Sequence, residues 1–349
     1  MGPDRSPAAL RRRQDELVRR ASSATSVREV FEVATTRLPG VLPFANSVWT
    51  AADPASGLPS APTLWDDDAA RTRCNRLWRK RLDDGEVAGF VALTRTTHST
   101  RVHRAGDREV RAILRCEDTP WGLVSLRRRA SQEPFTAAEL RLLAGLTEPL
   151  GRIVRRLVQT GLRRGPEPTV PHGPGLLLFD PRLELVSVGG DVEPWVSTFD
   201  DDAHVGTDFD LPLPMWIVTA AAHALTSARA RGTGHVTVRA ATRRDHWVAA
   251  QASATRGADA RPDGVAVTIE SARPSALAPV IAAAHGISDR EREVVRHVIA
   301  GTGTSAIAAT LGISSHTVRD HVKSVLRKVG VSSRAELTAF LLGIHRRVP

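Results

Sequence analysis

Residues 286–343 read GISDREREVVRHVIAGTGTSAIAATLGISSHTVRDHVKSVLRKVGVSSRAELTAFLLG, and this stretch decides the fold of the C-terminal part of the chain. Its apolar residues recur at helical spacing in three segments separated by tight turns, and a fourth short helix follows. Gly312 and Gly330 end the second and third segments, because glycine readily adopts the left-handed conformation found at a helix C-terminus. The stretch therefore predicts an all-α domain over residues 286–349.

Hydroxyl side chains mark the starts of three of these helices. Ser288 can accept a hydrogen bond from the N–H of Glu291 while the Glu291 carboxylate reaches back, which makes a capping box. Ser333 and Glu336 form the same pair before the last helix, and Ser314 stands at the cap position of the third helix. These residues give the expected helices defined starts.

The third helix, from residue 314 to about residue 329, shows two different faces. Valines spaced by four, three and four residues form an apolar face: Val318, Val322, Val325 and Val329. The opposite face is polar: His316, Arg319, Asp320, Lys323 and Arg327. A helix that enters the major groove of DNA needs this division between an apolar and a hydrogen-bonding face. The alternative is the solvated face of an ordinary amphipathic helix, but the tight turn and the capped fourth helix favour a DNA-binding helix-turn-helix.

The stretch also follows a longer pattern. It has an Arg-Glu pair in the first helix, a glycine before the second, Ile-Ser and then Thr-Val-basic-x-His in the third, and Lys-x-Gly-Val after it. The residues that carry this pattern are Arg290, Glu291, Gly301, Ile313, Ser314, Thr317, Val318, Arg319, His321, Lys328, Gly330 and Val331. The segment therefore resembles the C-terminal DNA-binding domain of LuxR-type transcriptional regulators, which implies sequence-specific DNA binding.

The resemblance also implies which residues touch DNA. The residues expected to face base edges are Arg319, Asp320 and Lys323. The residues expected to approach phosphates are Thr304, Ser315, Thr317 and Lys328. The family commonly has Asn-Lys-Glu at the start of the second helix, where this chain has Thr304, Ser305 and Ala306, so we expect one phosphate contact fewer there. Asp320 either repels phosphate or accepts from a cytosine amino group.

The charge distribution agrees with this interpretation. Residues 285–349 hold ten Lys and Arg against five Asp and Glu, so this short segment carries +5 of the chain's formal net charge of +10. Such a concentration of positive charge suits binding to a phosphate backbone. The rest of the excess is spread over the chain.

The whole chain has 349 residues, 42% of them hydrophobic, which is enough for about two or three globular domains. No apolar run reaches the roughly 18 residues of a membrane helix, and Gln14, Asp15 and Glu16 stand where a signal peptide would be apolar. We therefore expect a cytoplasmic protein with no membrane partner. Cys74 and Cys116 are the only cysteines, too few for a disulfide framework or a cysteine-rich zinc site, and no cofactor is expected.

Residues 10–160 alternate between helical and strand patterns. Strands are predicted at 87–93, 110–115 and 121–126, and a long helix at 137–159. The order of these elements, with a Trp-Gly-Leu-Val-Ser-Leu strand before a Glu-Pro-Phe-Thr-x-x-Glu-Leu helix start, resembles an α/β GAF sensory domain. The long helix has more apolar positions than one face of a domain needs, so we expect the sensory part to form a homodimer.

Residues 161–174 are rich in proline and glycine and are predicted to be a linker, as are residues 273–285. Between them, 175–272 shows two strands joined by Asp-Pro, a helical stretch at 216–230 and three further strands. This order resembles an α/β PAS domain, in which the helical segment and the sheet would enclose any small-molecule ligand. The candidates for lining such a pocket are Trp195, Phe199, Met215, Trp216 and Trp247. Ordinary core packing is the alternative for each of them.

The sequence thus predicts a multidomain chain in which GAF-like and PAS-like α/β modules control an all-α helix-turn-helix domain. No phosphate-cradling glycine-rich lysine motif is present, and other catalytic patterns are weak, so we do not expect an enzyme. The expected partners are double-stranded DNA, a second copy of the chain, an unidentified small molecule and RNA polymerase. Two rivals stay open: a promoter-reading domain of a sigma factor, and a signalling or scaffold protein whose helix-turn-helix is a dimerisation surface.

Overall fold

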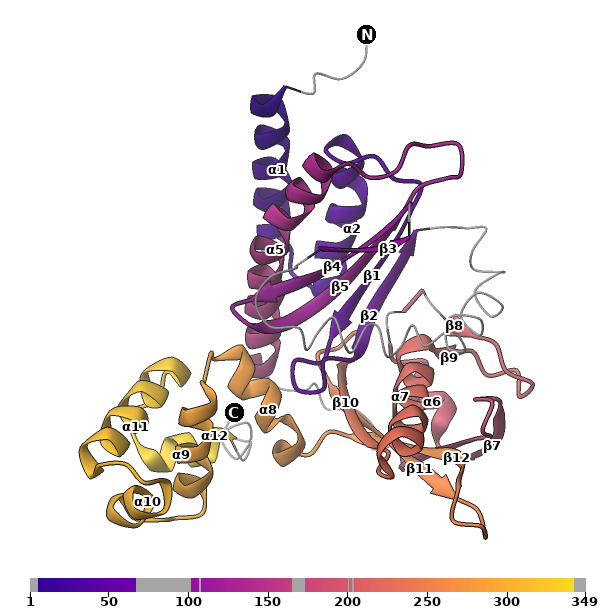
Figure 1. Cartoon of the computed structure of the whole chain (residues 1–349). Coiled ribbons are helices and arrows are strands. Elements are labelled where there is room, and N and C mark those ends of the chain that lie inside the picture. Colours follow the sequence, from indigo (N-terminus) through magenta and orange to yellow (C-terminus); the bar gives the residue numbers. More distant parts are fainter. Residues whose placement is uncertain are drawn as a thin grey trace. The chain divides into compact units, whose positions relative to one another are not determined.

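The computed structural model describes residues 6–66, 102–106, 108–164, 173–199, 201–202 and 204–341. It divides the chain into two compact units, Met1–Ser271 (unit 1) and Ala272–Pro349 (unit 2), shown in Figure 1. The strand predicted at 87–93 and Cys74 lie outside the described residues. Every helix in the described ranges is too short or too polar to span a bilayer.

Residues 7–164, which we call the first module, form a sheet with helices on one face (Figure 1). The strands are β1 (Asn46–Ala52), β2 (Pro59–Asp66), β3 (Val102–Gly106), β4 (Glu109–Cys116) and β5 (Thr119–Arg127). The helices are α1 (Pro7–Ser22), α2 (Val27–Arg37), the short 3-10 helix η1 (Leu38–Gly40) and α5 (Ala137–Arg164). The sheet has the order β2-β1-β5-β4-β3, and its neighbours are antiparallel. Phe31 of α2 stacks on Trp49 of β1 with ring centroids 6.0 Å apart, so the core lies between helices and sheet.

The long helix α5 starts at the residues that the sequence predicts. The Glu139 N–H donates to Thr136 Oγ1 at 3.2 Å, and the Thr136 N–H donates to the Glu139 carboxylate at 2.8 Å. The helix packs on β4, α1 and α2. Its apolar side chains are buried there: Leu143, Leu146, Leu150, Ile153 and Val154. These residues lie in the core of unit 1, whereas Leu140 and Leu157 are only partly buried, so formation of a homodimer stays a prediction.

Residues 173–271, which we call the second module, form another mixed α/β layer structure. The strands are β6 (Gly175–Phe179), β7 (Leu185–Gly190), β8 (His204–Val205), β9 (Leu213–Pro214), β10 (His235–Ala241), β11 (Trp247–Arg256) and β12 (Pro262–Ser271). The helices are α6 (Val192–Val196) and α7 (Met215–Arg231). The main sheet has the order β10-β11-β12-β6-β7, and α7 packs on its three longest strands. Alternate residues of β11 face α7, and Val248, Ala250 and Ala252 are buried in this core.

The two main sheets share one topology among their described strands. Counted within each module, with β8 and β9 set aside, both orders read second, first, fifth, fourth, third. All neighbouring strands in both sheets are antiparallel. The sequence shows no repeat of fixed period, because what the modules share is strand order rather than residue spacing.

Buried polar contacts join the two modules. Arg239 of β10 donates through Nη1 to Asp53 Oδ2 at 3.0 Å, beside the β1–β2 turn. Asp201 accepts from the Thr63 N–H of β2 and from Trp216 Nε1 of α7. Two apolar residues of the same hairpin belong to the core cluster of the second module: Leu58 and Ala61. The two modules therefore pack against each other as one unit and are not independent domains.

Both predicted linkers contain helix. Helix α5 runs to Arg164, so the segment predicted as a linker at 161–174 begins as helix, and residues 165–172 lie outside the described residues. The linker predicted at 273–285 is wrong, because it holds α8 (Pro274–Ala284). Pro274 fits the first turn of a helix, where its missing N–H costs no bond. An apolar stripe follows at helical spacing and is buried: Leu277, Val280, Ile281 and Ala284.

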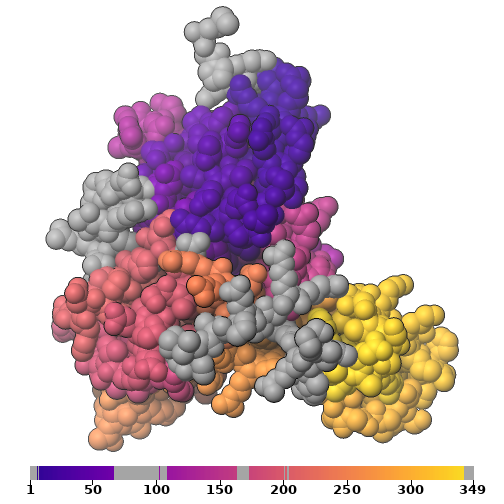
Figure 2. All heavy atoms as spheres, turned by 180° about the vertical axis from the view of Figure 1, so that it is seen from behind, coloured from indigo at the N-terminus to yellow at the C-terminus, as the bar shows by residue number. Residues whose placement is uncertain are grey.

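Unit 2 continues with the four helices that the sequence predicts: α9 (Asp289–Ile299), α10 (Thr304–Leu311), α11 (Ser315–Val329) and α12 (Arg334–Leu341). Helix α8 packs on α12, and the ring of His285 meets that of Phe340 edge to face at 5.5 Å. The unit has its own buried residues on every one of these helices. In the space-filling view the yellow atoms of α11 and α12 form a continuous surface (Figure 2).

Candidate nucleic-acid interface

The start of α9 holds a buried carboxylate. The predicted capping box is present: the Glu291 N–H donates to Ser288 Oγ at 3.3 Å, and the Ser288 N–H donates to Glu291 Oε2 at 2.7 Å. The same carboxylate oxygen accepts from the Lys328 ammonium of α11 at 2.6 Å. Burial alone would raise the pKa of Glu291, but the hydrogen bonds from Lys328 and the Ser288 backbone lower it to about 2. Glu291 is therefore charged at neutral pH and fastens α11 to α9.

The turn between α10 and α11 is held from both sides. Gly312 adopts a left-handed conformation with φ 64°, and the Ile313 N–H donates to the Ala308 carbonyl at 3.0 Å. Arg290 of α9 donates through Nη2 to the Leu311 carbonyl at 2.7 Å, so one of the last carbonyls of α10 has a partner. These contacts fix the angle at which α11 leaves α10, and so the face that α11 presents to solvent.

Helix α11 has the two faces that the sequence predicts. Ser314 caps it by accepting from the Thr317 N–H at 3.0 Å. The valine face is buried: Val318, Val322, Val325 and Val329. The polar face is exposed: His316, Arg319, Asp320, Lys323 and Arg327. Among the described residues, Arg319 and Lys323 make no ion pair with another side chain, whereas His316 Nδ1 lies 2.9 Å from Asp320 Oδ2.

The residues expected at phosphates lie in more varied surroundings. Thr304 opens α10, and its hydroxyl accepts from Arg334 Nη2 at 3.0 Å. Thr317 Oγ1 lies 2.9 Å from the capping hydroxyl of α11, and Ser315 is the partly buried first residue of that helix. Lys328 has its ammonium on Glu291, which gives it a structural role beside the expected one. The phosphate contacts of all four residues stay predictions.

Sequence reasoning missed Arg334. It is the first residue of α12, and its guanidinium reaches the first residue of α10, 30 positions earlier in the chain. The family's polar run is missing at the start of α10, and Arg334 supplies a cation at that place. The sequence predicts the cap formed by Ser333 and Glu336, but it does not predict a role for the arginine between them. The Glu336 N–H does donate to Ser333 Oγ, at 3.1 Å, while the Glu336 carboxylate accepts from the N–H of Ser332.

The predicted ligand-pocket residues are all buried in the second module: Trp195, Phe199, Met215, Trp216 and Trp247. Phe199 and Trp216 meet edge to face with centroids 5.2 Å apart, as in an ordinary aromatic core. Trp247 also lines a pocket at the junction of the two modules. No group of three or more potential metal ligands occurs among the described residues.

Residues 285–341 match the family model described as bacterial regulatory proteins, luxR family. The spore germination protein GerE of Bacillus subtilis is 38% identical over 56 residues, which are 16% of this chain and 76% of GerE. The chain belongs to the luxR family. Its helix-turn-helix is thus a luxR-family DNA-binding domain, in agreement with the resemblance seen in the sequence.

Two longer relatives are similar over shorter shares of their length. A putative helix-turn-helix transcriptional regulator of Aeromonas salmonicida is 40% identical over 78 residues, 22% of this chain and 38% of that protein. The probable transcriptional regulatory protein NarL of Mycobacterium tuberculosis is 40% identical over 67 residues, 19% of this chain and 28% of NarL. The chain therefore matches well under two thirds of the length of these two regulators.

Proposed function

We propose that this protein is a transcriptional regulator that binds double-stranded DNA through α11 and is controlled by unit 1. The observation that carries the DNA-binding part is the exposed face of α11, on which Arg319, Asp320 and Lys323 lie opposite the buried valines. A helix with such a face can place its polar side chains against base edges in the major groove. Phosphate contacts are assigned to Thr304, Ser315, Thr317 and Lys328.

In the same proposal the first module acts as a GAF-like sensor and the second as a PAS-like sensor. The support is architectural: each module has a five-stranded antiparallel sheet among its described strands, with helices packed on it. The buried contacts between Asp53 and Arg239, and between Thr63 and Asp201, would let a change in one module reach the other. The modules would then respond to a signal together.

The protein is proposed to act in the cytoplasm as a homodimer, at promoters served by RNA polymerase. A homodimer would read two half-sites about one helical turn apart, because each recognition helix enters one major groove. The rival function is a scaffold that acts through protein partners and uses the helix-turn-helix as a dimerisation surface. Nothing in the exposed cationic face of α11 favours that rival, since a dimer surface buries apolar side chains.

The proposal is tested by DNA binding of the full-length protein. Fluorescence anisotropy with sites recovered from a genome-wide footprint should give an affinity that falls steeply with salt. The double variant Arg319→Ala/Lys323→Ala should lose the preference for these sites over random duplex. Arg296→Ala, an exposed arginine of α9, is the matched control and should keep the preference. Salt-independent binding, or equal site preference in the double variant, would favour the scaffold.

A further inference from the structure

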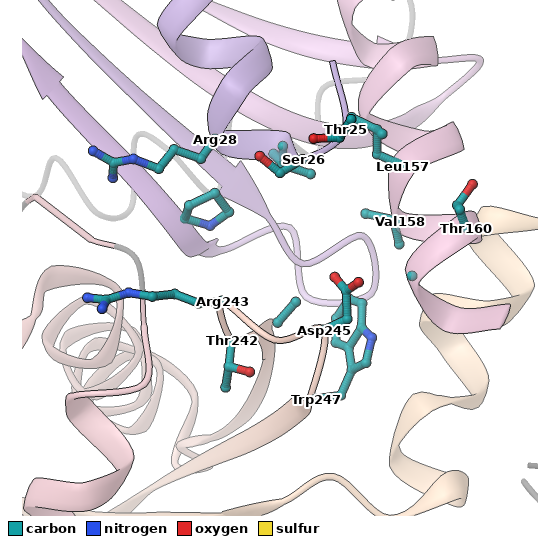
Figure 3. Close-up of a pocket in the computed structure, with 14 residues that line it drawn as sticks. Thr25, Ser26, Arg28, Leu157, Val158, Thr160, Thr242, Arg243, Asp245 and Trp247 are labelled. Carbon is teal, nitrogen blue, oxygen red and sulfur yellow. The ribbon is translucent and has the colours of Figure 1, made fainter. Parts of the chain in front are cut away.

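A pocket with a volume of about 190 Å³ lies at the junction of the two modules in unit 1 (Figure 3). The first module contributes the connection between α1 and α2, the first turn of α2 and the C-terminal part of α5. The second module contributes the turn between β10 and β11 and the first residue of β11. The lining residues that matter here are Ser26, Leu157, Val158, Thr242, Asp245 and Trp247.

Asp245 brings a negative charge into this pocket. Figure 3 shows its carboxylate directed into the space beside the Trp247 indole, while Arg28 and Arg243 extend away from it. Asp245 is partly buried, and no described residue makes a hydrogen bond or ion pair with its carboxylate. Of these two arginines, Arg28 contacts the carboxylates of Glu32 and Asp202, each at 3.0 Å. Within the part of the chain that the structure describes, the Asp245 carboxylate therefore has no cationic partner.

The backbone of Asp245 is held in a defined turn. Asp245 has a left-handed backbone with φ 57°, and its N–H donates to the Thr242 carbonyl at 3.1 Å. Helix α5 passes close to it at Gly161, where a Cβ atom would lie 3.3 Å from Asp245 Oδ1. A larger residue at position 161 would press on the carboxylate. The junction thus presents one anionic group next to an aromatic ring and two hydroxyl groups.

We propose that this pocket binds a small organic cation, an amine whose compact apolar body is no larger than a single ring. The ammonium would donate a charge-assisted hydrogen bond to Asp245, and the Ser26 and Thr242 hydroxyl oxygens could accept its remaining N–H bonds. The indole of Trp247 attracts a cation electrostatically, and Leu157 and Val158 cover the apolar part. The size limit follows from the volume, because an apolar cavity of about 150 Å³ holds a benzene molecule.

Binding would bridge the modules, since Asp245 and Trp247 belong to the second module and Leu157 and Val158 to the first. The proposal that this pocket binds an amine does not depend on whether the protein binds DNA. Its role as the signal input rests on the proposed regulatory function. An amine that favours one arrangement of the junction would then change DNA affinity, and DNA would change amine affinity by the same factor.

The direct test uses three probes that have the same phenyl ring and a short side chain but differ in charge. They are protonated phenethylamine, neutral 2-phenylethanol and anionic phenylacetate. Saturation-transfer NMR and calorimetry with the full chain should show the cation binding roughly tenfold tighter than the alcohol, because the ammonium adds a charge–charge attraction to Asp245 that the neutral alcohol lacks. Phenylacetate should bind more weakly than the alcohol.

Two variants locate the effect. Asp245→Asn should reduce phenethylamine affinity roughly tenfold and leave 2-phenylethanol nearly unchanged. Asp210→Asn is the matched control, because Asp210 also has a left-handed backbone, with φ 54°, but is exposed and does not line the pocket. Equal affinity of the Asp245→Asn protein, tighter binding of phenylacetate, or no amine binding at millimolar concentration would each overturn the proposal. If the amine binds but DNA affinity is unchanged, the proposed binding site stands and only its proposed regulatory role is refuted.

Discussion

The ammonium of Lys328 lies 2.6 Å from the carboxylate of Glu291 and joins the end of α11 to the start of α9. The Glu291 side chain is only 6% exposed, so its charge depends on partners that exist in the folded domain. Those partners are the lysine and the backbone N–H of Ser288. Removing one partner of a buried pair costs more than replacing both, because a lone buried charge remains. This difference allows the structural and DNA-binding roles of Lys328 to be separated.

The pair should make unit 2 sensitive to acid. Because the pKa of Glu291 is lowered from 4.5 to about 2, its contribution to stability is fully present above pH 4.5 and is lost as pH falls toward 2. The contribution is on the order of 3 kcal/mol. Glu291→Gln should lose it. Hydrogen-exchange mass spectrometry of α9 and α11 should show a difference between the two proteins that shrinks with falling pH. A difference that stays constant with pH would contradict this assignment.

Lys328→Met should destabilise unit 2 by about 3–5 kcal/mol, because it leaves the Glu291 carboxylate buried without its cation. The double variant Glu291→Gln/Lys328→Met should recover much of that loss. If Lys328 also contacts a phosphate, the folded double variant will bind all duplexes more weakly, with the salt slope reduced by about one. An unchanged salt slope in the double variant would leave Lys328 with its structural role alone.

Lys323 should contribute to sequence discrimination rather than to general affinity. Its side chain is exposed on the polar face of α11 and makes no ion pair among the described residues. Lys323→Ala should therefore weaken binding to the cognate site by about 1–3 kcal/mol more than binding to random duplex. Arg296→Ala on α9 serves as the control of equal charge change. Equal losses on both duplexes would move Lys323 to the residues that contact phosphate.

The sequence predicted unit 2 well because its structure is specified locally. The caps at Ser288 and Ser314, the left-handed Gly312 and the valine spacing of α11 each act over a few residues, and all are present. The features of unit 2 that were not predicted from the sequence depend mainly on contacts between distant positions. The contact from Arg334 to Thr304 spans 30 positions, and helix α8 was obscured by its prolines although its apolar spacing was readable.

Unit 1 was predicted less completely for the same physical reason. Strand patterns near β4, β5 and β6 were readable, but the pairing of the modules through Asp53 and Arg239 joins residues 186 positions apart. The aromatic residues proposed to line a ligand pocket could not be sorted from sequence, since core and pocket positions have the same composition. Trp247 faces a space whose other wall comes from residues 25–28 and the end of α5.

Two glycines of the helix-turn-helix offer a matched test of backbone conformation. At both Gly312 and Gly303 a Cβ atom would meet nothing within 4 Å, but Gly312 has φ 64° and Gly303 has φ −68°. Gly312→Ala should destabilise unit 2 by about 1 kcal/mol or more through strain. Gly303→Ala should be close to neutral, because the lower entropy of the unfolded chain is offset by the poorer N-cap that alanine makes. Hydrogen exchange in α10 and α11 should report both changes. Equal effects of the two substitutions on stability would show that the left-handed backbone at Gly312 does not require glycine.

The junction of the modules should depend on Arg239. The Asp53 side chain is fully buried, and burial raises its pKa while Arg239 opposes that rise. Arg239→Met leaves the carboxylate without its cation and should lower the stability of unit 1 by about 3–5 kcal/mol at neutral pH. All seven tryptophans lie within residues 1–271, so tryptophan fluorescence during urea unfolding follows this unit alone. Arg231→Met, at the exposed end of α7, is the control.

The pH dependence of the Arg239→Met variant identifies the cause of its instability. Burial already raises the pKa of Asp53 in the wild-type fold, and loss of the opposing guanidinium raises it further above the pKa in the unfolded chain. Folding then requires a proton above the unfolded pKa, and the stability of the variant decreases as pH rises through that range. The deficit relative to wild type should therefore shrink as pH falls toward the unfolded pKa of Asp53. A deficit that is constant with pH would mean that lost packing of the arginine stem, and not the buried charge, destabilises the junction.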